Sequence, residues 1–174
     1  MFGSISEADP AWSPAGDLVA FSVLDDSGNS SGIFLRNPDG VNRIQISQSN
    51  DRNPAWSPDA KHLAFVSTRD GSEDIYVVEI GENGPHGQAL QITQAPGRDF
   101  APIWSENGDR IAFLSDRNGI IDIFTIDPDG ENLETLTRSP VNISSMDWSN
   151  DNRLVFESIN SGASQLFVID SSGI

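Results

Sequence analysis

The chain has 174 residues, of which 26 are acidic and 10 are basic, and its formal net charge is −16. A surface of that charge repels the phosphate backbone from which nucleic-acid-binding proteins draw much of their affinity, so nucleic-acid binding is not expected. The sequence contains no apolar run of roughly 18 residues, the length that spans a membrane, and no basic, apolar leader resembling a signal peptide. It contains no cysteine, which excludes disulfides, thiol nucleophiles and Cys-ligated zinc within the chain.

A phrase centred on tryptophan recurs four times along the chain. "DPAWSPAGDLVAF" (9–21) is followed by "NPAWSPDAKHLAF" (53–65), "APIWSENGDRIAF" (101–113) and a more divergent "SMDWSNDNRLVF" (145–156). Every tryptophan of the chain falls in this register, at Trp12, Trp56, Trp104 and Trp148, with separations of 44, 48 and 44 residues. A period of about 20 to 50 residues is typical of solenoids, propellers and other arrays. We expect one continuous region, 1–174, with repeats at approximately 8–47, 52–93, 100–137 and 144–174.

Each repeat divides into short segments that predict β-strands. The second segments read "LVAFS", "HLAFVS", "RIAFLS" and "RLVFES", and the third read "GIFLR", "DIYVVEI", "DIFTID" and "QLFVID". They are rich in Val, Ile and Phe and are bounded by Gly, Pro, Asn and Asp. The stretches "NPDG" (37–40) and "DPDG" (127–130) predict the hairpin turns that follow. The second repeat has four additional residues within "VEIGENGPHGQAL", which we interpret as a loop insertion.

The second segment of each repeat indicates how the repeats associate. In "RIAFLS", the side chains on both faces of the strand are apolar, whereas a sheet with one solvated face would alternate. A meander that is buried on both faces must lie between two like sheets, as a blade does in a β-propeller. The predicted fold is therefore all-β, a propeller built from four repeated four-stranded antiparallel blades. Eight aromatic residues are expected to seal neighbouring blades: Trp12, Trp56, Trp104, Trp148, Phe21, Phe65, Phe113 and Phe156.

The fourth repeat ends before a fourth segment, so its blade is expected to lack an outer strand. The stretch "FGSIS" (2–6) is the available candidate to complete that blade. Four blades can close by themselves, form half of an eight-bladed ring, or be a piece of a longer chain. An open stack would expose an apolar face at each end, so we favour a homo-oligomer, namely a dimer with eight blades.

The residue types offer no machinery for catalysis, so no catalytic residue, cofactor or metal site is predicted. His62 and His86 are the only histidines. His62 is expected to be a packed or surface residue of a strand, and His86 a solvated residue of the inserted loop. Serine-type hydrolysis needs a nucleophile with an adjacent base, and the sequence indicates no such pair. "DPDG" lacks the further ligands of a calcium loop and is interpreted as a turn.

The topology of a meander places a set of loops on one face, which we call the loop face: 48–52, 68–73, 94–100, 116–119 and 138–144. This set contains half of the basic residues of the chain. Arg and aromatic anchors carry much of the energy of protein interfaces. Asp147 is added because the other residues that precede a repeat tryptophan are apolar. The expected partner-binding residues are Arg52, Arg98, Asp99, Phe100, Arg138 and Asp147, whereas Arg69 and Arg117 are expected to pair within their own blades.

The repeats resemble the blade signature of the TolB-type, WD-like β-propeller family. The second repeat, "NPAWSPDAKHLAFVSTRDGSEDIYVVEI", and the third, "APIWSENGDRIAFLSDRNGIIDIFTIDPDGENLETLT", carry the resemblance almost throughout. It implies a non-catalytic scaffold that presents its loop face to a protein or peptide, and a periplasmic or extracellular location. Two alternatives remain open: a carbohydrate-binding or carbohydrate-active propeller, and a structural fragment or engineered blade array without a ligand of its own.

Overall fold

The computed structural model describes residues 6–48, 50–138, 142–160 and 162–170. Throughout these described ranges, the regular elements are fifteen β-strands, and none is a helix. The strands form four antiparallel meanders, three of four strands and one of three, which we number blades 1 to 4 in chain order. The all-β propeller architecture predicted from the repeats is confirmed. The candidate strand 2–6 for the last blade lies outside the described residues, except for Ser6 in β1.

The blades have the following strands. Blade 1 contains β1 (Ser6–Trp12), β2 (Val19–Leu24), β3 (Ser30–Arg36) and β4 (Arg43–Gln45). Blade 2 contains β5 (Arg52–Trp56), β6 (His62–Ser67), β7 (Asp74–Gly81) and β8 (Gly84–Gln91). Blade 3 contains β9 (Asp99–Trp104), β10 (Ile111–Ser115), β11 (Asp122–Ile126) and β12 (Glu134–Thr135). Blade 4 contains β13 (Ile143–Trp148), β14 (Arg153–Asn160) and β15 (Ala163–Asp170).

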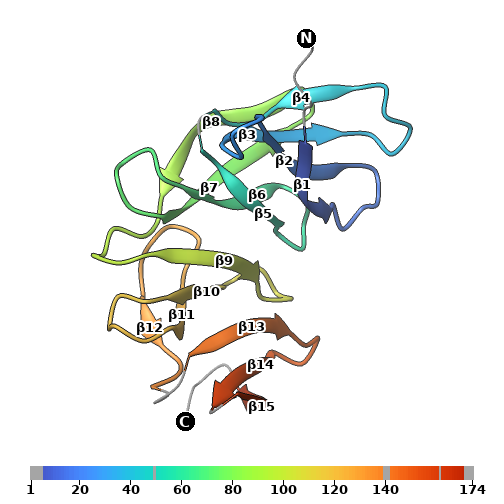
Figure 1. Ribbon diagram of the computed structural model, residues 1–174. Coiled ribbons are helices and arrows are strands. Elements are labelled where there is room, and N and C mark those ends of the chain that lie inside the picture. The colour runs from blue at the N-terminus through green and yellow to red at the C-terminus, as the bar shows by residue number, and fades with distance from the viewer. Residues whose placement is uncertain (1–5, 49, 139–141, 161, 171–174) are drawn as a thin grey trace.

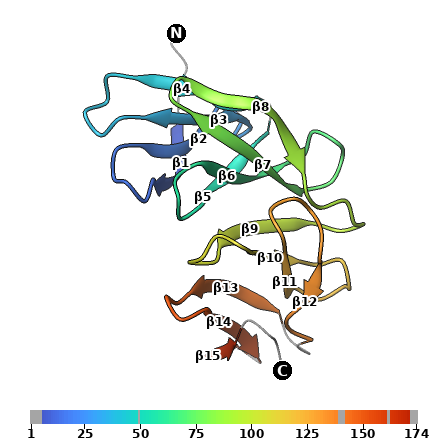
Figure 2. The same ribbon diagram turned by 180° about the vertical axis from the view of Figure 1, so that it is seen from behind.

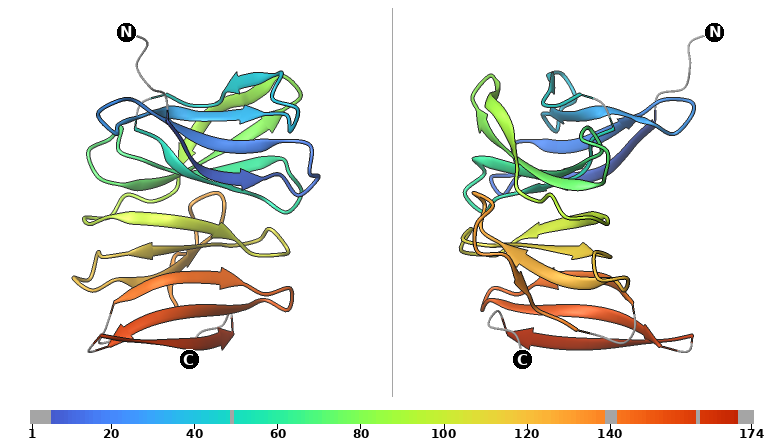
Figure 3. Two further views of the ribbon diagram at one scale, coloured as in Figure 1. Left: turned by 45° about the vertical axis from the view of Figure 1, so that its right-hand side comes forward. Right: turned by 90° about the vertical axis from the view of Figure 1, so that its left-hand side faces the viewer.

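The blades follow one another in chain order, and their first strands adjoin (Figure 1). Strand β5 contacts both β1 and β9, and β9 in turn contacts β13. The view from behind shows the same succession (Figure 2). Blade 1, in blue, and blade 4, in red, lie at opposite ends of the stack (Figure 3). Each of these two blades therefore has one face that no other blade of this chain covers.

The residues between blades form continuous apolar layers, as the two-sided strands predict. Between blades 1 and 2, Ile33 and Leu35 of blade 1 join Trp56, Phe65 and Tyr76 of blade 2 in one buried cluster. A corresponding cluster joins blades 2 and 3 around Trp104 and Phe113, and a third joins blades 3 and 4 around Leu154 and Phe156. Burial of apolar side chains on both faces of each inner sheet is the main stabilising term for such a stack.

The serine that follows each repeat tryptophan has a structural role in the next turn. The Ser57 hydroxyl donates to Asp59 at 2.6 Å and accepts the backbone N–H of His62 at 2.9 Å. The hydroxyls of Ser13, Ser105 and Ser149 make the same two kinds of bond in their own blades. The "WS" pair thus combines an inter-blade contact with a side-chain cap of the hairpin. This explains why the repeat contains both residues.

The four additional residues of the second repeat do not form a loop insertion. Strands β7 and β8 each have eight residues, and their pairing, with one register shift between Val77 and Glu79, extends as far as Gly81 and Gly84. The prediction of a longer loop was wrong because this segment lengthens the hairpin instead of its turn. His86 consequently lies in β8, opposite Glu79, although it is exposed as expected. The "NPDG" and "DPDG" stretches do form turns, closed by Gly40 N–H and Gly130 N–H.

Candidate functional site

The loop face is organised by ion pairs between the hairpins and the connections between blades. Arg52 forms an ion pair with Glu73 at 2.6 Å across blade 2. Arg69 binds the Asp51 carboxylate at 2.6 Å, and Arg117 binds that of Asp99 at 2.7 Å. These contacts fix the connections at the start of β5 and β9 to the hairpins beside them. The loop face of blades 2 and 3 is therefore a preorganised surface.

Asp51 and Asp99 are buried, and the carboxylate of each balances the positive charge of the arginine in its own blade. The guanidinium of Arg69 lies 4.5 Å from the ring centroid of Tyr76, and that of Arg117 lies 4.6 Å from the ring centroid of Phe124. Each arginine thus combines an ion pair with a cation–π contact. The expectation that Arg69 and Arg117 pair within their blades agrees with these contacts. Asp99 cannot offer its carboxylate to a partner without breaking this pair.

Arg98 and Phe100 combine an exposed cation with a half-buried ring on this surface. The Asp116 carboxylate accepts hydrogen bonds from the backbone N–H of Arg98 at 2.7 Å and from its Nε at 2.8 Å. These two bonds lower the pKa of Asp116 below its usual value. The Arg98 side chain remains 55% exposed, with its guanidinium 5.5 Å from the ring centroid of the half-buried Phe100.

A glycine permits this close arrangement. Gly97 has a φ of +107°, and a Cβ at this position would lie 2.8 Å from the Cα of Arg117. Only a residue without a side chain allows the connection to approach the neighbouring hairpin so closely. The backbone therefore presents Arg98 at a fixed position beside the Arg117–Asp99 pair.

The remaining predicted partner-binding residues lie apart from this pair. Arg138 is exposed at the end of blade 3, next to residues 139–141, which lie outside the described ranges. Asp147 is exposed in β13 of blade 4, and its carboxylate accepts the backbone N–H of Trp148 at 3.0 Å. Arg52, Arg98 and Phe100 are thus gathered on blades 2 and 3. Whether any of the six contacts a partner stays a prediction.

Six of the eight predicted inter-blade aromatics pack between blades of this chain. Trp56, Trp104, Phe65 and Phe113 are buried between blades 1, 2 and 3. Phe156 and Trp148 pack in the layer between blades 3 and 4. Trp12 is 61% exposed, because no blade of this chain precedes blade 1. Phe21 is buried on the same side, where the Arg36 guanidinium lies 4.9 Å from its ring centroid.

The first strands of all four blades line a central cavity of about 320 Å³. Its walls are formed by short polar and proline-containing stretches, which are Asp9–Pro10, Asn53–Pro54, 101–103 and 144–146. Asp9, Asn53 and Ala101 each have a φ between 50° and 53° at a break in strand register. Non-glycine residues rarely adopt this conformation, and the break is a β-bulge repeated three residues before the tryptophan. The sequence pattern alone does not predict this recurring bulge.

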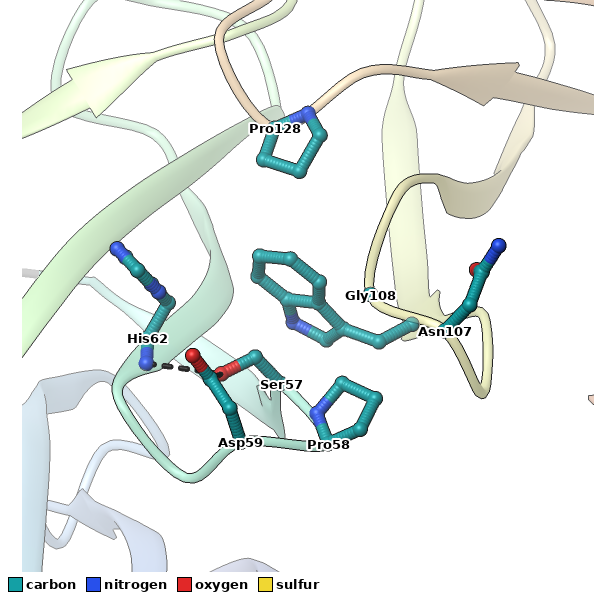
Figure 4. Close-up of a pocket in the computed structure, with 8 residues that line it drawn as sticks. Ser57, Pro58, Asp59, His62, Asn107, Gly108 and Pro128 are labelled. Atoms are coloured by element: carbon teal, nitrogen blue, oxygen red, sulfur yellow. Dashed lines mark hydrogen bonds between the residues drawn. The ribbon is translucent and has the colours of Figure 1, made fainter.

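A second pocket, of about 450 Å³, lies between blades 2 and 3 on the side of the "WS" turns (Figure 4). Trp104, His62, Pro58 and Pro128 are among the residues that line it. The ring centroids of His62 and Trp104 lie 6.2 Å apart, so His62 packs beside the inter-blade tryptophan. The Ser57 hydroxyl, whose hydrogen bond lowers the pKa of Asp59, is engaged in the turn. We find no nucleophile–base pair among the described residues that line this pocket.

Two further findings concern metals and membranes. Within the described ranges, no group of three or more His, Asp or Glu side chains gathers closely enough to hold a metal ion. No helix in the described part of the chain is long and apolar enough to cross a membrane.

Comparison with known proteins identifies relatives of this repeat. No protein-family model matches the chain. The Tol-Pal system protein TolB of Alcanivorax borkumensis is 39% identical over 64 residues, which are 36% of this chain and 14% of that protein. The protein TolB homolog of Chlorobium luteolum is 33% identical over 75 residues, which are 42% of this chain and 16% of that protein. The matched segments are thus a small part of the length of these relatives.

Solved structures show the same fold over nearly the whole chain. A structure described as TolB of Agrobacterium tumefaciens superposes with a TM-score of 0.82 at 26% identity, covering 95% of this chain and 61% of that one. A puromycin-hydrolyzing peptidase of Mycobacterium tuberculosis superposes with a TM-score of 0.76 at 18% identity, covering 97% of this chain and 30% of that one. The second likeness shows the fold alone. The tryptophan-centred repeat and its meander blades are thus similar to those of TolB-type β-propellers, over part of the length of these proteins.

Proposed function

We propose that this chain is a non-catalytic TolB-like propeller scaffold that binds a segment of a protein or peptide on its loop face. The observation that carries the proposal is the pair of Arg98 and Phe100. Asp116 holds the exposed guanidinium of Arg98 in place beside the half-buried ring of Phe100. An arginine and an aromatic ring that are already ordered lose little entropy when a partner binds. Such residues are enriched among those that dominate protein interfaces.

The surroundings of this pair support the same role. The ion pairs Arg52–Glu73 and Arg117–Asp99 connect the adjacent strand starts to their hairpins. Preorganised surfaces carry more of their contact energy into affinity than mobile loops do. The Alcanivorax relative is named as a protein of the Tol-Pal system. We extend to this chain a role in binding other proteins. The similarity to a peptidase concerns the fold alone.

Selection from a random peptide library on the immobilised chain provides ligands with which to test the proposal. Binding of each selected peptide is then measured by calorimetry with the unmodified chain and with two variants, Arg98→Glu and Arg153→Glu. Arg153 is a matched control, because it is 56% exposed and also forms an ion pair with an aspartate, Asp151. We expect Arg98→Glu to weaken binding at least about tenfold and Arg153→Glu to leave it unchanged, consistent with loss of one interface anchor.

Peptide binding that does not depend on Arg98 would contradict the proposal. If peptides bind with equal affinity to the unmodified chain and to Arg98→Glu, the Arg98–Phe100 surface is not their site. A circular-dichroism melt of each variant accompanies the titration, because both substitutions replace exposed side chains and should leave the fold intact.

A further inference from the structure

The pocket between blades 2 and 3 lies at an internal joint of the chain, so a complete blade forms each of its sides. Blade 2 contributes the turn between β5 and β6, and blade 3 contributes the turns that contain Gly108 and Pro128. Figure 4 shows Pro58 and Pro128 on opposite sides of the pocket. Its volume of about 450 Å³ is within the range of sites for small molecules.

One position in the repeat distinguishes this joint from the others. It lies six residues after the tryptophan and is occupied by Leu18, His62 and Arg110 in blades 1 to 3. Leu18 packs against the apolar cluster between blades 1 and 2. The Arg110 guanidinium forms ion pairs with Asp127 at 2.9 Å and with Glu134 at 3.2 Å. The chain itself thus provides contacts for the side chains of Leu18 and Arg110.

His62 has no equivalent contact for its polar atoms. Its backbone N–H donates to the Ser57 hydroxyl at 2.9 Å, and its ring lies 6.2 Å from that of Trp104. Across the described parts of the chain, however, neither ring nitrogen of His62 forms a hydrogen bond. Both nitrogens of an imidazole take part in hydrogen bonds wherever a partner is available, and His62 is half-buried. A ligand in the pocket can supply the missing partner.

The Asp59 carboxylate gives the pocket a negative charge. Its Oδ1 accepts the Ser57 hydroxyl at 2.6 Å and the backbone N–H of Lys61 at 3.0 Å, which leaves Oδ2 available. The Ser57 bond, followed by that of the Lys61 N–H, lowers the pKa of Asp59, so this group is ionised at neutral pH. No lysine or arginine lines the pocket among the residues that the structure describes. The charge is therefore open to a cation from outside the chain.

We infer that this pocket binds a small organic cation with an apolar ring, such as an arylalkyl ammonium ion. The ring fits between the two prolines and beside Trp104, whose indole attracts a cation more strongly than other aromatic side chains do. The ammonium group donates to Asp59 Oδ2 and to a ring nitrogen of His62. The net charge of −16 attracts such ions from solution. The pocket lies on the side of the "WS" turns, so the inference is independent of the proposed function of the loop face.

NMR titration of the chain with the phenethylammonium ion tests the inference. We expect a saturable shift of the His62 imidazole signals and of the Trp104 indole N–H, unchanged His86 signals, and a dissociation constant of about 1 mM or lower. Phenethyl alcohol has the same ring without the charge, so it should bind at least about tenfold more weakly, since it lacks the charged hydrogen bond to Asp59. Signals of His62 and Trp104 that do not move at about 10 mM of the cation overturn the inference.

Two variants replace pocket residues with those that the chain has at the same position in other blades. His62→Leu places the leucine of blade 1 beside Trp104, so it should fill the space and abolish binding. Asp59→Asn copies Asn107 of blade 3, whose side-chain oxygen accepts the Ser105 hydroxyl at 2.8 Å, so the turn should remain capped. The affinity of this variant for the cation should fall at least about tenfold, toward that for phenethyl alcohol. The Trp104 indole N–H signal reports binding in both variants.

His86→Leu is the matched control, because it removes the other histidine at a side chain that is 76% exposed and lies outside the pocket. This variant should bind the cation as the wild type does. Binding that survives His62→Leu would place the ligand elsewhere, and it would contradict the inference. Equal affinities for the cation and for phenethyl alcohol would contradict it as well, because Asp59 would then not recognise the charge. A circular-dichroism melt of each variant separates loss of binding from loss of the fold.

Discussion

The Arg117 guanidinium donates to the carboxylate of Asp99 at 2.7 Å, and both side chains are removed from solvent, with Asp99 1% and Arg117 11% exposed. The same guanidinium lies over the rings of Phe113 and Phe124 and donates through Nε to the Ser115 hydroxyl. Blade 2 repeats the arrangement with Arg69 and Asp51. This pair ties the connection before each first strand to the second hairpin of the same blade, so it belongs to the architecture of the loop face.

Replacing Asp99 with asparagine should strongly destabilise the chain. The substitution leaves the nearly buried Arg117 charge without its counter-charge, and breaking a buried pair in this way costs about 3 to 5 kcal/mol. Urea unfolding of Asp99→Asn and of the wild type measures the difference in free energy. Asp151→Asn, which breaks the exposed pair with Arg153, serves as the control and should change stability little. Equal effects of the two substitutions would show that the buried pair stabilises the chain no more than the exposed pair does.

The sequence predicted the blades well because repetition and strand pattern are local signals. The tryptophan register, the two-sided apolar strands and the Pro-Asp-Gly turns are each visible within a few residues. The lengthened hairpin of β7 and β8 was missed, since additional residues with mixed polarity fit a loop and an extended ladder equally well. Pairing between strands depends on tertiary contacts, so a short sequence pattern cannot distinguish these two structures.

The candidate site was harder to predict because charge alone does not reveal burial. Asp99 was selected as a surface residue, yet it is buried against Arg117. A signal for this pair exists in the sequence. An aspartate five residues before the tryptophan occurs in the two repeats that also have arginine in the second hairpin, whereas Glu7 and Ile143 stand at this position in the other repeats. This co-occurrence within one chain indicates contact between the two positions.

Trp104→Ala tests the contribution of an inter-blade tryptophan. Trp104 is buried between blades 2 and 3 and donates to the Ala55 carbonyl, so its loss removes a large side chain and leaves a cavity. We expect a loss of about 3 to 5 kcal/mol in the free energy of unfolding, as for other buried aromatic residues. Leu133→Ala, at an exposed side chain, is the control. A loss below about 1 kcal/mol for Trp104→Ala would show that the joint between these blades does not depend on it.

Tyr76, the only tyrosine of the chain, should resist ionisation in the folded state. Burial raises the pKa of its phenol above the ordinary value of 10.0, and Asp70, whose carboxylate accepts the phenol hydrogen bond, raises it further. The native state therefore keeps a proton that the unfolded state loses. This contribution to stability is complete below the unfolded pKa and is lost as the pH rises toward the native value.

Tyrosinate absorbance during an alkaline titration measures this pKa directly. The transition should lie above that of the same chain in urea, and Asp70→Asn should move it downward because one of its two main causes is removed. A folded chain that titrates like the unfolded chain would show that the phenol is not held by Asp70 and the surrounding residues.

The ion pair of His86 and Glu79 gives a further pH dependence, at the lengthened hairpin of blade 2. His86 Nδ1 lies 3.0 Å from the Glu79 carboxylate on the adjacent strand, and this contact raises the pKa of His86 above its ordinary value of 6.5. A raised histidine pKa means that the folded state binds the proton more tightly than the unfolded state does. The contribution is therefore complete below the unfolded pKa and is lost as the pH rises through the native one.

NMR titration of the imidazole signals measures the His86 pKa, and His62→Gln assigns the two histidines of the chain. Glu79→Gln should lower the pKa of His86 toward its ordinary value, because the carboxylate is both its hydrogen-bond partner and its counter-charge. The two side chains are on paired strands, so the shift also reports whether the β7–β8 ladder extends to residues 79 and 86. A pKa that Glu79→Gln leaves unchanged would show that the Glu79 carboxylate does not hold His86, contrary to the contact between β7 and β8.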